Sequence, residues 1–525
     1  MRPGLTPEAR ATGLLGRGVP GPFPLILILA LAAVVLAVAA FLRSAEYDEG
    51  YSLLLAAGTV RPAWPEAVFV VGEVRGIYEG RASLSGILEA LRGTDVHPPL
   101  YFWLLRLWRD VAGEGLFAAR LLSVVLTLGA LVLVPGIAAR AGAPPVAAML
   151  LCLFSYAFAY TGIIARGFAL AQLLTLAAAW LALAERRRAD GSEAGPSLAG
   201  AAVIGACAGL ATMSNYLALF CAATVLAWHA LFIGLRRPAH LIAAALPFLA
   251  VQAVNVPLFL AQDRRSGQFP PFSVTGAAAR TAQWLAASVF GGTPLQAEAP
   301  LSYAIGAALG LLILLLAVVI VATLASSLRQ PEGLLVWACA LAPPAGLVAL
   351  GVIFGNLPLE LRYYAFASPF IAIILAGAFA ALAERGWPRA AGAGLAVVLL
   401  AQAAGLAGLG FGQGTMQPAR AVARDAAPLL GPDTVVVVAH GNDGVGIAGA
   451  LILELPAKAR VLVVRERDDA EAIRARLDGA RRAIVVTTAG DFSSREEVPK
   501  ALAAIAADPS WRETGAGYNQ RVFSR

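Results

Sequence analysis

Charged residues are scarce in this chain. Asp, Glu, Lys and Arg together make up 14% of the 525 residues, whereas hydrophobic residues make up 59%. Soluble domains average about 25% charged and about 45–50% apolar residues. The apolar residues also come in long blocks rather than in short periods, which excludes a disordered chain, collagen and a coiled coil. The composition therefore predicts a polytopic helical membrane protein and not an ordinary cytosolic enzyme.

Cysteine and histidine are also rare, with four of each. All four cysteines lie in apolar segments without a C-x-x-C spacing, so we interpret them as small core residues and not as a disulfide framework. His229 and His240 have no partner at metal-ligand spacing. H-E-x-x-H, P-loop and nucleophile-elbow patterns are missing. The sequence therefore predicts neither a bound metal nor a cofactor. The cysteines are Cys152, Cys207, Cys221 and Cys339.

Lysine is nearly missing, since only Lys458 and Lys500 occur, and the formal net charge of +7 comes from arginine. The arginines lie between apolar blocks, which is typical of a topology signal in a membrane protein. We therefore expect no nucleic-acid partner. A composition rich in alanine and arginine but poor in lysine favours a GC-rich bacterial genome, and hence the bacterial cytoplasmic (inner) membrane.

Long apolar runs define the membrane part. Residues 23–42 carry no charge, which is enough for one span. This run is longer than the core of a cleaved signal peptide, so a signal anchor is the better interpretation. Residues 98–112 contain Arg106, Arg109 and Asp110 and form either a tilted, partly inserted helix or a further crossing. We predict about 11–13 transmembrane helices in all. The other runs are about 116–139, 144–164, 167–184, 198–215, 217–235, 241–260, 300–324, 334–355, 365–383 and 389–410.

The positive-inside rule orients these spans. Arginines mark one set of span ends, at Arg140, 186–188, 236–237, Arg329 and 385–389, and we place these ends in the cytoplasm together with the N-terminus. The opposite ends then face outward. They carry the segment 43–97, Arg166, Asn215, the loop 261–299 and Arg362.

Near residue 411 the pattern becomes that of a soluble protein. Strand-like runs at 434–439, 460–465 and 483–488 alternate with helical stretches, which predicts a small α/β layer with a parallel sheet. The fold class is thus mainly α, a polytopic membrane protein with a small C-terminal α/β domain. We divide the chain into a cytoplasmic tail (1–21), a membrane domain (22–410) with outer loops 43–97 and 261–299, and an extracytoplasmic domain (411–525).

Two short motifs indicate chemistry. The first is Glu46-Tyr47-Asp48-Glu49-Gly50-Tyr51, which puts three carboxylates within four residues just after the first span. The second is His97-Pro98-Pro99-Leu100-Tyr101-Phe102-Trp103, where prolines precede an aromatic helix start. Taken alone, the first is also compatible with a solvated juxtamembrane loop, and the second with a plain helix start signal.

Together, these motifs resemble the GT-C superfamily of membrane glycosyltransferases. The likeness is to the branch of the protein O-mannosyltransferases and aminoarabinose transferases (glycosyltransferase family 39 and relatives), and it extends over roughly residues 20–410. Further stretches fit. The stretch Ala-Arg-Gly-Phe-Ala-Leu at residues 165–170 is similar to the family's Ala-Arg-x-Tyr-x-Leu. Residues 361–364, followed by Pro369, are similar to its late Arg-Tyr…Pro element. Residues 118–121 are similar to its third motif. Asn215-Tyr216 departs from the family, whose members often have a basic residue there.

The resemblance implies a polyprenyl-phosphate-linked sugar as donor, used at the outer face of the membrane. The catalytic carboxylate of the family maps onto Asp48, with Glu49 beside it. The chemistry agrees, because transfer to a hydroxyl needs a base that takes the acceptor proton. The anionic leaving group needs cations, and arginine offers a bidentate fork.

The donor-phosphate group predicted on this basis comprises His97, Arg166, Arg362 and Tyr363. Each arginine also has a structural alternative, since it can snorkel or pair within the protein. We interpret Arg120 as such an internal partner. Asp263 and Arg264 open the second outer loop, which is either an acceptor lid or a plain hydrophilic loop.

A competing motif lies in the C-terminal domain. Gly444-Val-Gly446-Ile-Ala-Gly449 follows a strand, and Glu466 follows the next strand, which is the layout of a dinucleotide fingerprint. However, the turn before it is longer than the fingerprint requires, and the domain has only three clear strands. A turn with close helix packing explains these glycines better.

The sequence thus predicts an integral membrane glycosyltransferase that moves a sugar from a polyprenyl-phosphate donor to an envelope glycan, lipid (lipopolysaccharide included) or protein. The resemblance implies inversion by direct displacement. The main alternative is a lipid-linked sugar transporter or flippase, although polar residues gather at one face rather than at the midplane that transporters use. A membrane scaffold with a sensing domain is a third class, which would need no carboxylate pair.

Overall fold

The computed structural model describes residues 14–18, 20–94, 96–191, 195–262, 269–292, 301–412 and 417–525. The chain forms two compact units, each built from three stretches of sequence. The membrane unit comprises Met1–Phe41, Leu91–Tyr101 and Arg120–Thr415. The α/β unit comprises Leu42–Ala90, Phe102–Ala119 and Met416–Arg525. Most of the outer segment that we assigned to the membrane domain, residues 42–90, therefore shares a unit with the C-terminal domain.

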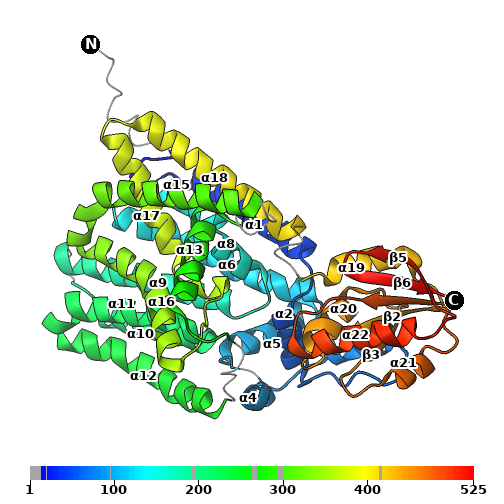
Figure 1. Cartoon of the computed structure of the whole chain (residues 1–525). Coiled ribbons are helices and arrows are strands. Elements are labelled where there is room, and N and C mark those ends of the chain that lie inside the picture. The colour runs from blue at the N-terminus through cyan, green and yellow to red at the C-terminus, as the bar shows by residue number, and fades with distance from the viewer. Residues whose placement is uncertain are drawn as a thin grey trace. The chain divides into compact units, whose positions relative to one another are not determined.

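The membrane unit consists of apolar helices (Figure 1). Several begin with proline in the first turn, where its missing N–H costs nothing, as in α12 and α16. The helices are α1 (Pro22–Leu42), α6 (Leu116–Arg140), α7 (Pro145–Phe154), α8 (Tyr156–Ile163), α9 (Phe168–Gly191), α10 (Leu198–Ser214), α11 (Leu219–Phe232), α12 (Pro238–Ala261), α13 (Val274–Phe290), α15 (Leu301–Leu324), α16 (Pro331–Phe354), α17 (Ser368–Glu384) and α18 (Pro388–Phe411).

Among the described residues, eight helices are long and apolar enough to cross a membrane, or up to nine if the bent pair α7–α8 forms one span. The protein is thus a multi-pass membrane protein. The number is lower than the 11–13 spans we predicted because α10 and α17 have only 17 residues each. The helix α5 (Leu100–Ala112), which covers the ambiguous stretch, has 13 residues and is too short to cross alone.

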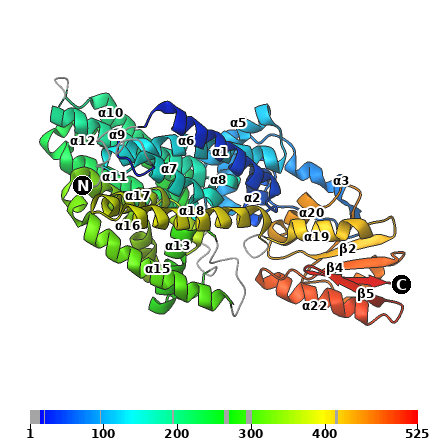
Figure 2. The ribbon, with the colours of Figure 1, turned by 90° about the horizontal axis from the view of Figure 1, so that it is seen from above.

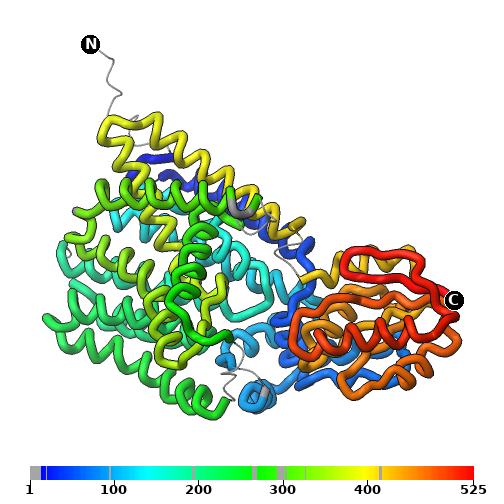
Figure 3. Tube along the Cα trace, viewed as in Figure 1, coloured from blue at the N-terminus to red at the C-terminus, as the bar shows by residue number. Residues whose placement is uncertain are grey.

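Small residues let the membrane helices approach closely. α10 lies between α9 and α12 (Figure 3). A Cβ atom on Gly205 of α10 would lie 1.8 Å from the carbonyl oxygen of Ala244 in α12, so only glycine fits at this crossing.

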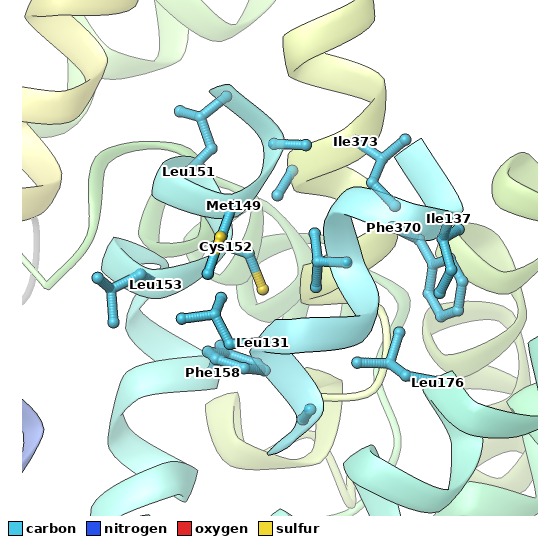
Figure 4. Close-up of a cluster of buried hydrophobic side chains, with 14 of the residues drawn as sticks. Leu131, Ile137, Met149, Leu151, Cys152, Leu153, Phe158, Leu176, Phe370 and Ile373 are labelled. Atoms are coloured by element: carbon cyan, nitrogen blue, oxygen red, sulfur yellow. The ribbon is translucent and has the colours of Figure 1, made fainter. Parts of the chain in front are cut away.

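The main core lies where α6, α7, α8, α9 and α17 meet, around Leu131, Met149 and Phe370 (Figure 4). Cys152 is part of this core, as we expected for a small apolar side chain.

The α/β unit is built on a six-stranded sheet with the order β1-β3-β2-β4-β6-β5. β3, β2 and β4 are parallel, and the other neighbours are antiparallel. The strands are β1 (Phe69–Val70), β2 (Thr434–Ala439), β3 (Arg460–Val464), β4 (Arg482–Val486), β5 (Arg512–Gly517) and β6 (Gln520–Ser524). The three parallel strands are those that the sequence predicts, whereas β1, β5 and β6 are additional.

Helices surround this sheet. α21 and α22 pack on one face, where Val435, Leu462 and Val485 meet Ile473 and Ile505. Figure 2 shows α22 running beside the strands. The outer segment adds β1 as an edge strand, with Phe69 opposite Val461 of β3. The helices are α2 (Tyr47–Ala57), α3 (Val71–Val74), α4 (Leu84–Thr94, whose last residues belong to the membrane unit), α19 (Ala419–Ala426), α20 (Ala450–Glu454), α21 (Ala470–Arg476) and α22 (Phe492–Ala506).

Candidate active site

The predicted carboxylates lie in the first turn of α2. Glu46 is the N-cap residue, and it forms a capping box in which its backbone N–H donates to the Glu49 carboxylate at 3.2 Å. Glu49 is fully buried, whereas Asp48 is half-buried. Acidic side chains are favourable at this helix end because of the positive pole of the helix dipole. The two adjacent carboxylates therefore differ in role, since Glu49 caps the helix and Asp48 is the more accessible one.

The start of α2 is tied to the C-terminal part of the α/β unit. The backbone N–H of Ala45 donates to Glu454 at 2.7 Å, and that of Tyr47 donates to the Gln417 side chain at 2.9 Å. Glu454 also pairs with Arg420 at 2.9 Å. Immediately before the helix, Glu46 forms a buried ion pair with Arg43. These bonds use otherwise unsatisfied polar groups at the helix entry and hold the first turn of α2 in place.

The other end of α2 is held by Arg109 of α5. Its guanidinium donates to the carbonyl oxygens of Leu53 at 3.0 Å and of Tyr78 at 2.5 Å. Arg109 is only 4% exposed, and burial lowers the pKa of its guanidinium. α2 then ends at Gly58, whose φ of 92° is in the left-handed region that favours glycine.

The glycines of the competing motif accommodate α2 and Trp64. A Cβ on Gly446 would lie 2.1 Å from the Tyr47 ring, and the Trp64 indole N–H donates to the carbonyl oxygen of Gly444 at 2.8 Å. Residues 445–449 form a π-helical turn, followed by only five residues of α20. The motif thus serves the close helix packing that we favoured over the dinucleotide fingerprint.

Two acidic side chains bind the loop that precedes this turn. Glu497 accepts from the backbone N–H of Gly441 at 2.8 Å, and Asp491 accepts from that of Asn442 at 3.0 Å. Glu497 is 1% exposed. Burial raises the pKa of Glu497 from 4.5 to about 7, and the negative charges of Asp491 and Glu466 make smaller contributions in the same direction. The backbone N–H groups that donate to Glu497 oppose this rise.

This raised pKa predicts a stability that falls as the pH rises. Between pH 4.5 and 7 the folded protein holds a proton on Glu497 that the unfolded chain has lost, so the free energy of unfolding decreases, by on the order of 3 kcal/mol in total. We expect Glu497→Gln to raise the Tm relative to wild type at pH 8 and much less at pH 5. The exposed neighbour Glu496→Gln serves as control. A Tm difference that is the same at both pH values would contradict this.

Two of the arginine motifs meet in the membrane unit. Arg166 lies between α8 and α9 and is 2% exposed, and Arg362 lies in a short 3₁₀ turn, residues Leu361–Tyr364. The segments meet through their aromatic residues, since the rings of Phe168 and Tyr363 stack with centroids 6.5 Å apart. The Arg362 guanidinium carbon lies 5.5 Å from the centre of the Tyr363 ring. Residues about 195 positions apart are thereby brought together.

The His97 segment is tied to the end of α12 within the same unit. The Gln262 side chain donates to the carbonyl oxygen of His97 at 2.8 Å, and the Tyr216 hydroxyl donates to Gln262 at 3.0 Å. Tyr216 belongs to the Asn215-Tyr216 motif, where the sequence differs from the family that it resembles. Gln262 therefore joins this motif to the His-Pro-Pro segment.

Comparison with known proteins rests on the structure alone. No model of a protein family matches the sequence, and no curated protein matches it. The crystal structure of ArnT from Cupriavidus metallidurans bound to undecaprenyl phosphate matches with a TM-score of 0.51 at 15% identity, covering 95% of this chain and 97% of that chain. The apo form of the same ArnT, at 14% identity and the same coverage, has a TM-score of 0.49. The chain has the GT-C fold of ArnT.

The match confirms the predicted fold class, and the resemblance to the aminoarabinose transferases holds at the level of the fold. Within this GT-C fold, the candidate residues form two groups. Asp48 and Glu49 belong to the α/β unit, whereas His97, Arg166, Arg362 and Tyr363 belong to the membrane unit. Asp263 and Arg264 lie outside the described residues. Arg120 donates to the carbonyl oxygen of Ala40 at 2.7 Å, which agrees with an internal structural partner.

Sequence reasoning missed three residues that hold the candidate segments, namely Arg109 and Asp443 in the α/β unit and Gln262 in the membrane unit. The Asp443 carboxylate accepts from the Tyr47 hydroxyl at 2.6 Å and from the Tyr51 hydroxyl. A weak signal existed in the two tyrosines, which are four residues apart and therefore on one face of α2. No comparable signal marked the partner, which lies 392 residues further along the chain.

Proposed function

We propose that the chain is an integral membrane glycosyltransferase that moves a sugar from a polyprenyl-phosphate-linked donor to an envelope glycan, lipid or protein at the outer face of the bacterial cytoplasmic membrane. The observation that carries the proposal is Asp48 in the first turn of a helix anchored at both ends, in a chain with the GT-C fold. The ArnT structure that shares this fold has undecaprenyl phosphate bound.

The reaction follows from the chemistry of the two groups of residues. Asp48 accepts the proton of the acceptor hydroxyl, whose oxygen forms a bond to the anomeric carbon of the sugar. The bond from that carbon to the phosphate oxygen breaks, and polyprenyl phosphate leaves with the electron pair, so the configuration inverts. Glu49 supports Asp48 by capping the helix that carries it.

The leaving phosphate requires fixed positive charge. Arg166 and Arg362 supply it in our proposal, because guanidinium groups bind phosphate with charge-assisted hydrogen bonds. His97 and Tyr363 complete the donor site by contact with the sugar or phosphate. We also propose that the arginine-bearing span ends and the N-terminus lie in the cytoplasm. This orientation puts residues 411–525 outside.

A donor panel tests the proposal. Purified protein is incubated with radiolabelled polyprenyl-phosphate sugars, among them mannose, glucose, galacturonate and aminoarabinose, together with an envelope extract. We expect one sugar to appear on an envelope component, or slowly as free sugar when the acceptor is left out, at a rate proportional to the amount of protein. If no sugar leaves any of these donors, the proposal fails.

A further inference from the structure

The inference concerns Asp443, which lies in the loop after β2 and is 8% exposed. Both oxygens of its carboxylate are used. Oδ2 accepts from the hydroxyls of Tyr47, at 2.6 Å, and Tyr51. Oδ1 accepts from the backbone N–H of Val445 at 3.0 Å, which fixes the carboxylate on its own loop. A single buried side chain of the loop after β2 thereby holds two side chains of α2.

These two tyrosines flank the predicted base. They lie one turn apart on the same face of α2, with hydroxyl oxygens 3.3 Å apart and rings edge to face at 5.1 Å. Each residue of an α-helix is rotated by about 100° from the one before it. A helix that is held at two points on one face is unable to rotate about its axis, so the direction of Asp48 is fixed as well.

We propose that Asp443 is a positioning residue of the transferase: by holding Tyr47 and Tyr51, it fixes the rotation of α2 and thereby the direction of the Asp48 carboxylate. The inference rests on the proposed function, since it takes Asp48 as the base. It gives the C-terminal domain a part in catalysis. Asp443 and Gln417 bind the first turns of α2, and Glu454 binds the backbone N–H of Ala45, two residues before the helix.

Packing and anchoring support this assignment. A Cβ on Gly446 would lie 2.1 Å from the Tyr47 ring, and one on Gly50 would lie 2.9 Å from Val445, so α2 and the loop are in close contact on this face. The loop itself is held from behind by Asp491 and Glu497. Burial and the neighbouring carboxylate of Asp443 raise the pKa of Tyr47, which keeps its hydroxyl protonated as a donor.

Steady-state kinetics test the proposal first. Asp443→Ala removes the acceptor of both hydroxyls, and we expect kcat to fall by about 10- to 100-fold, since a displacement of about 1 Å costs up to about 100-fold. The KM for the lipid-linked donor should change less than threefold, because the donor-phosphate residues belong to the membrane unit. The matched control is Asp468→Asn, a buried carboxylate of the same unit that binds Arg476 and the backbone of Arg465.

A second variant keeps the proposal testable if Asp443→Ala fails to fold. The double substitution Tyr47→Phe, Tyr51→Phe retains both rings and removes only the hydroxyls. We expect it to lower kcat by the same factor as Asp443→Ala, and the triple variant to lose no more than either. Additive losses, or a loss in donor KM alone, would overturn the proposal.

Hydrogen exchange of the α2 amides gives a readout that does not need activity. In the full chain in detergent, we expect peptides covering 47–57 to exchange at least 10-fold faster in the two variants than in wild type or Asp468→Asn. Faster exchange together with lower kcat supports the proposal, and unchanged exchange or unchanged kcat overturns it. If wild type transfers no sugar from any donor, both the proposed function and the positioning role of Asp443 are refuted. If wild type transfers sugar and the variants keep the full kcat, only the positioning role of Asp443 is refuted.

Discussion

Replacing Asp48 by asparagine is expected to lower kcat for sugar transfer by about 10²- to 10⁴-fold, because asparagine is unable to take the acceptor proton. The change keeps the size of the side chain in the first turn of α2, so the KM for the donor should change little. The measurement is the initial rate of transfer with the donor that the panel identifies, at saturating acceptor.

The control for Asp48→Asn is Glu89→Gln, which removes an exposed carboxylate from α4 without touching the helix caps. It should retain the wild-type rate. Equal rates in wild type and Asp48→Asn would contradict the assignment of the base and transfer the role to Glu49. The structure favours Asp48 for this role because the Glu49 carboxylate accepts from the backbone of Glu46 inside the capping box.

Replacing Arg362 by glutamine is expected to raise the KM for the lipid-linked donor by about 10- to 100-fold, because a charge-assisted hydrogen bond contributes about 1.5–3 kcal/mol. Lysine at this position should give an intermediate value, since it keeps the charge but loses the planar fork. The effect on binding is read from donor titrations at fixed enzyme concentration, with inhibition by free undecaprenyl phosphate as a second measure.

Arg329→Gln is the matched control, because Arg329 is an exposed arginine just before the start of α16, whereas Arg362 follows its end. It should leave the donor KM unchanged. If Arg362→Gln lowers the Tm but leaves the donor KM and the inhibition by undecaprenyl phosphate unchanged, Arg362 has a structural role and does not bind the donor.

Local patterns predicted much of the fold. The parallel strands β2, β3 and β4 were predictable because each is a buried run of mostly valine, leucine or isoleucine residues. β5 was not, since Arg-Glu-Thr-Gly-Ala-Gly is exposed throughout and has no apolar alternation. β1 has only two residues and pairs with a strand about 390 positions away. No local pattern in residues 42–90 indicated that they would share a compact unit with the C-terminal sheet.

The candidate site was predictable in its residue types but not in its geometry. Asp48 and Glu49 are neighbours in sequence, and only the helix start at Tyr47 turns one of them into a buried cap. Phe168 lies where the family that the sequence resembles has tyrosine, and only the structure shows that its ring stacks on Tyr363. The role of Asp443 depended on the fold entirely, because its two partners lie on a helix from the other end of the chain.

The central claim is that a sugar leaves its lipid phosphate at this protein, and proteoliposomes test it most directly. The donor carries one label on the sugar and another on the polyprenyl chain, and the acceptor is supplied on one side. We predict that labelled sugar appears on the acceptor with an equal amount of free polyprenyl phosphate, and that Asp48→Asn forms both products at least about 100-fold more slowly. Intact donor that only redistributes between the two leaflets, at the same rate in wild type and Asp48→Asn, would contradict the account and identify a transporter.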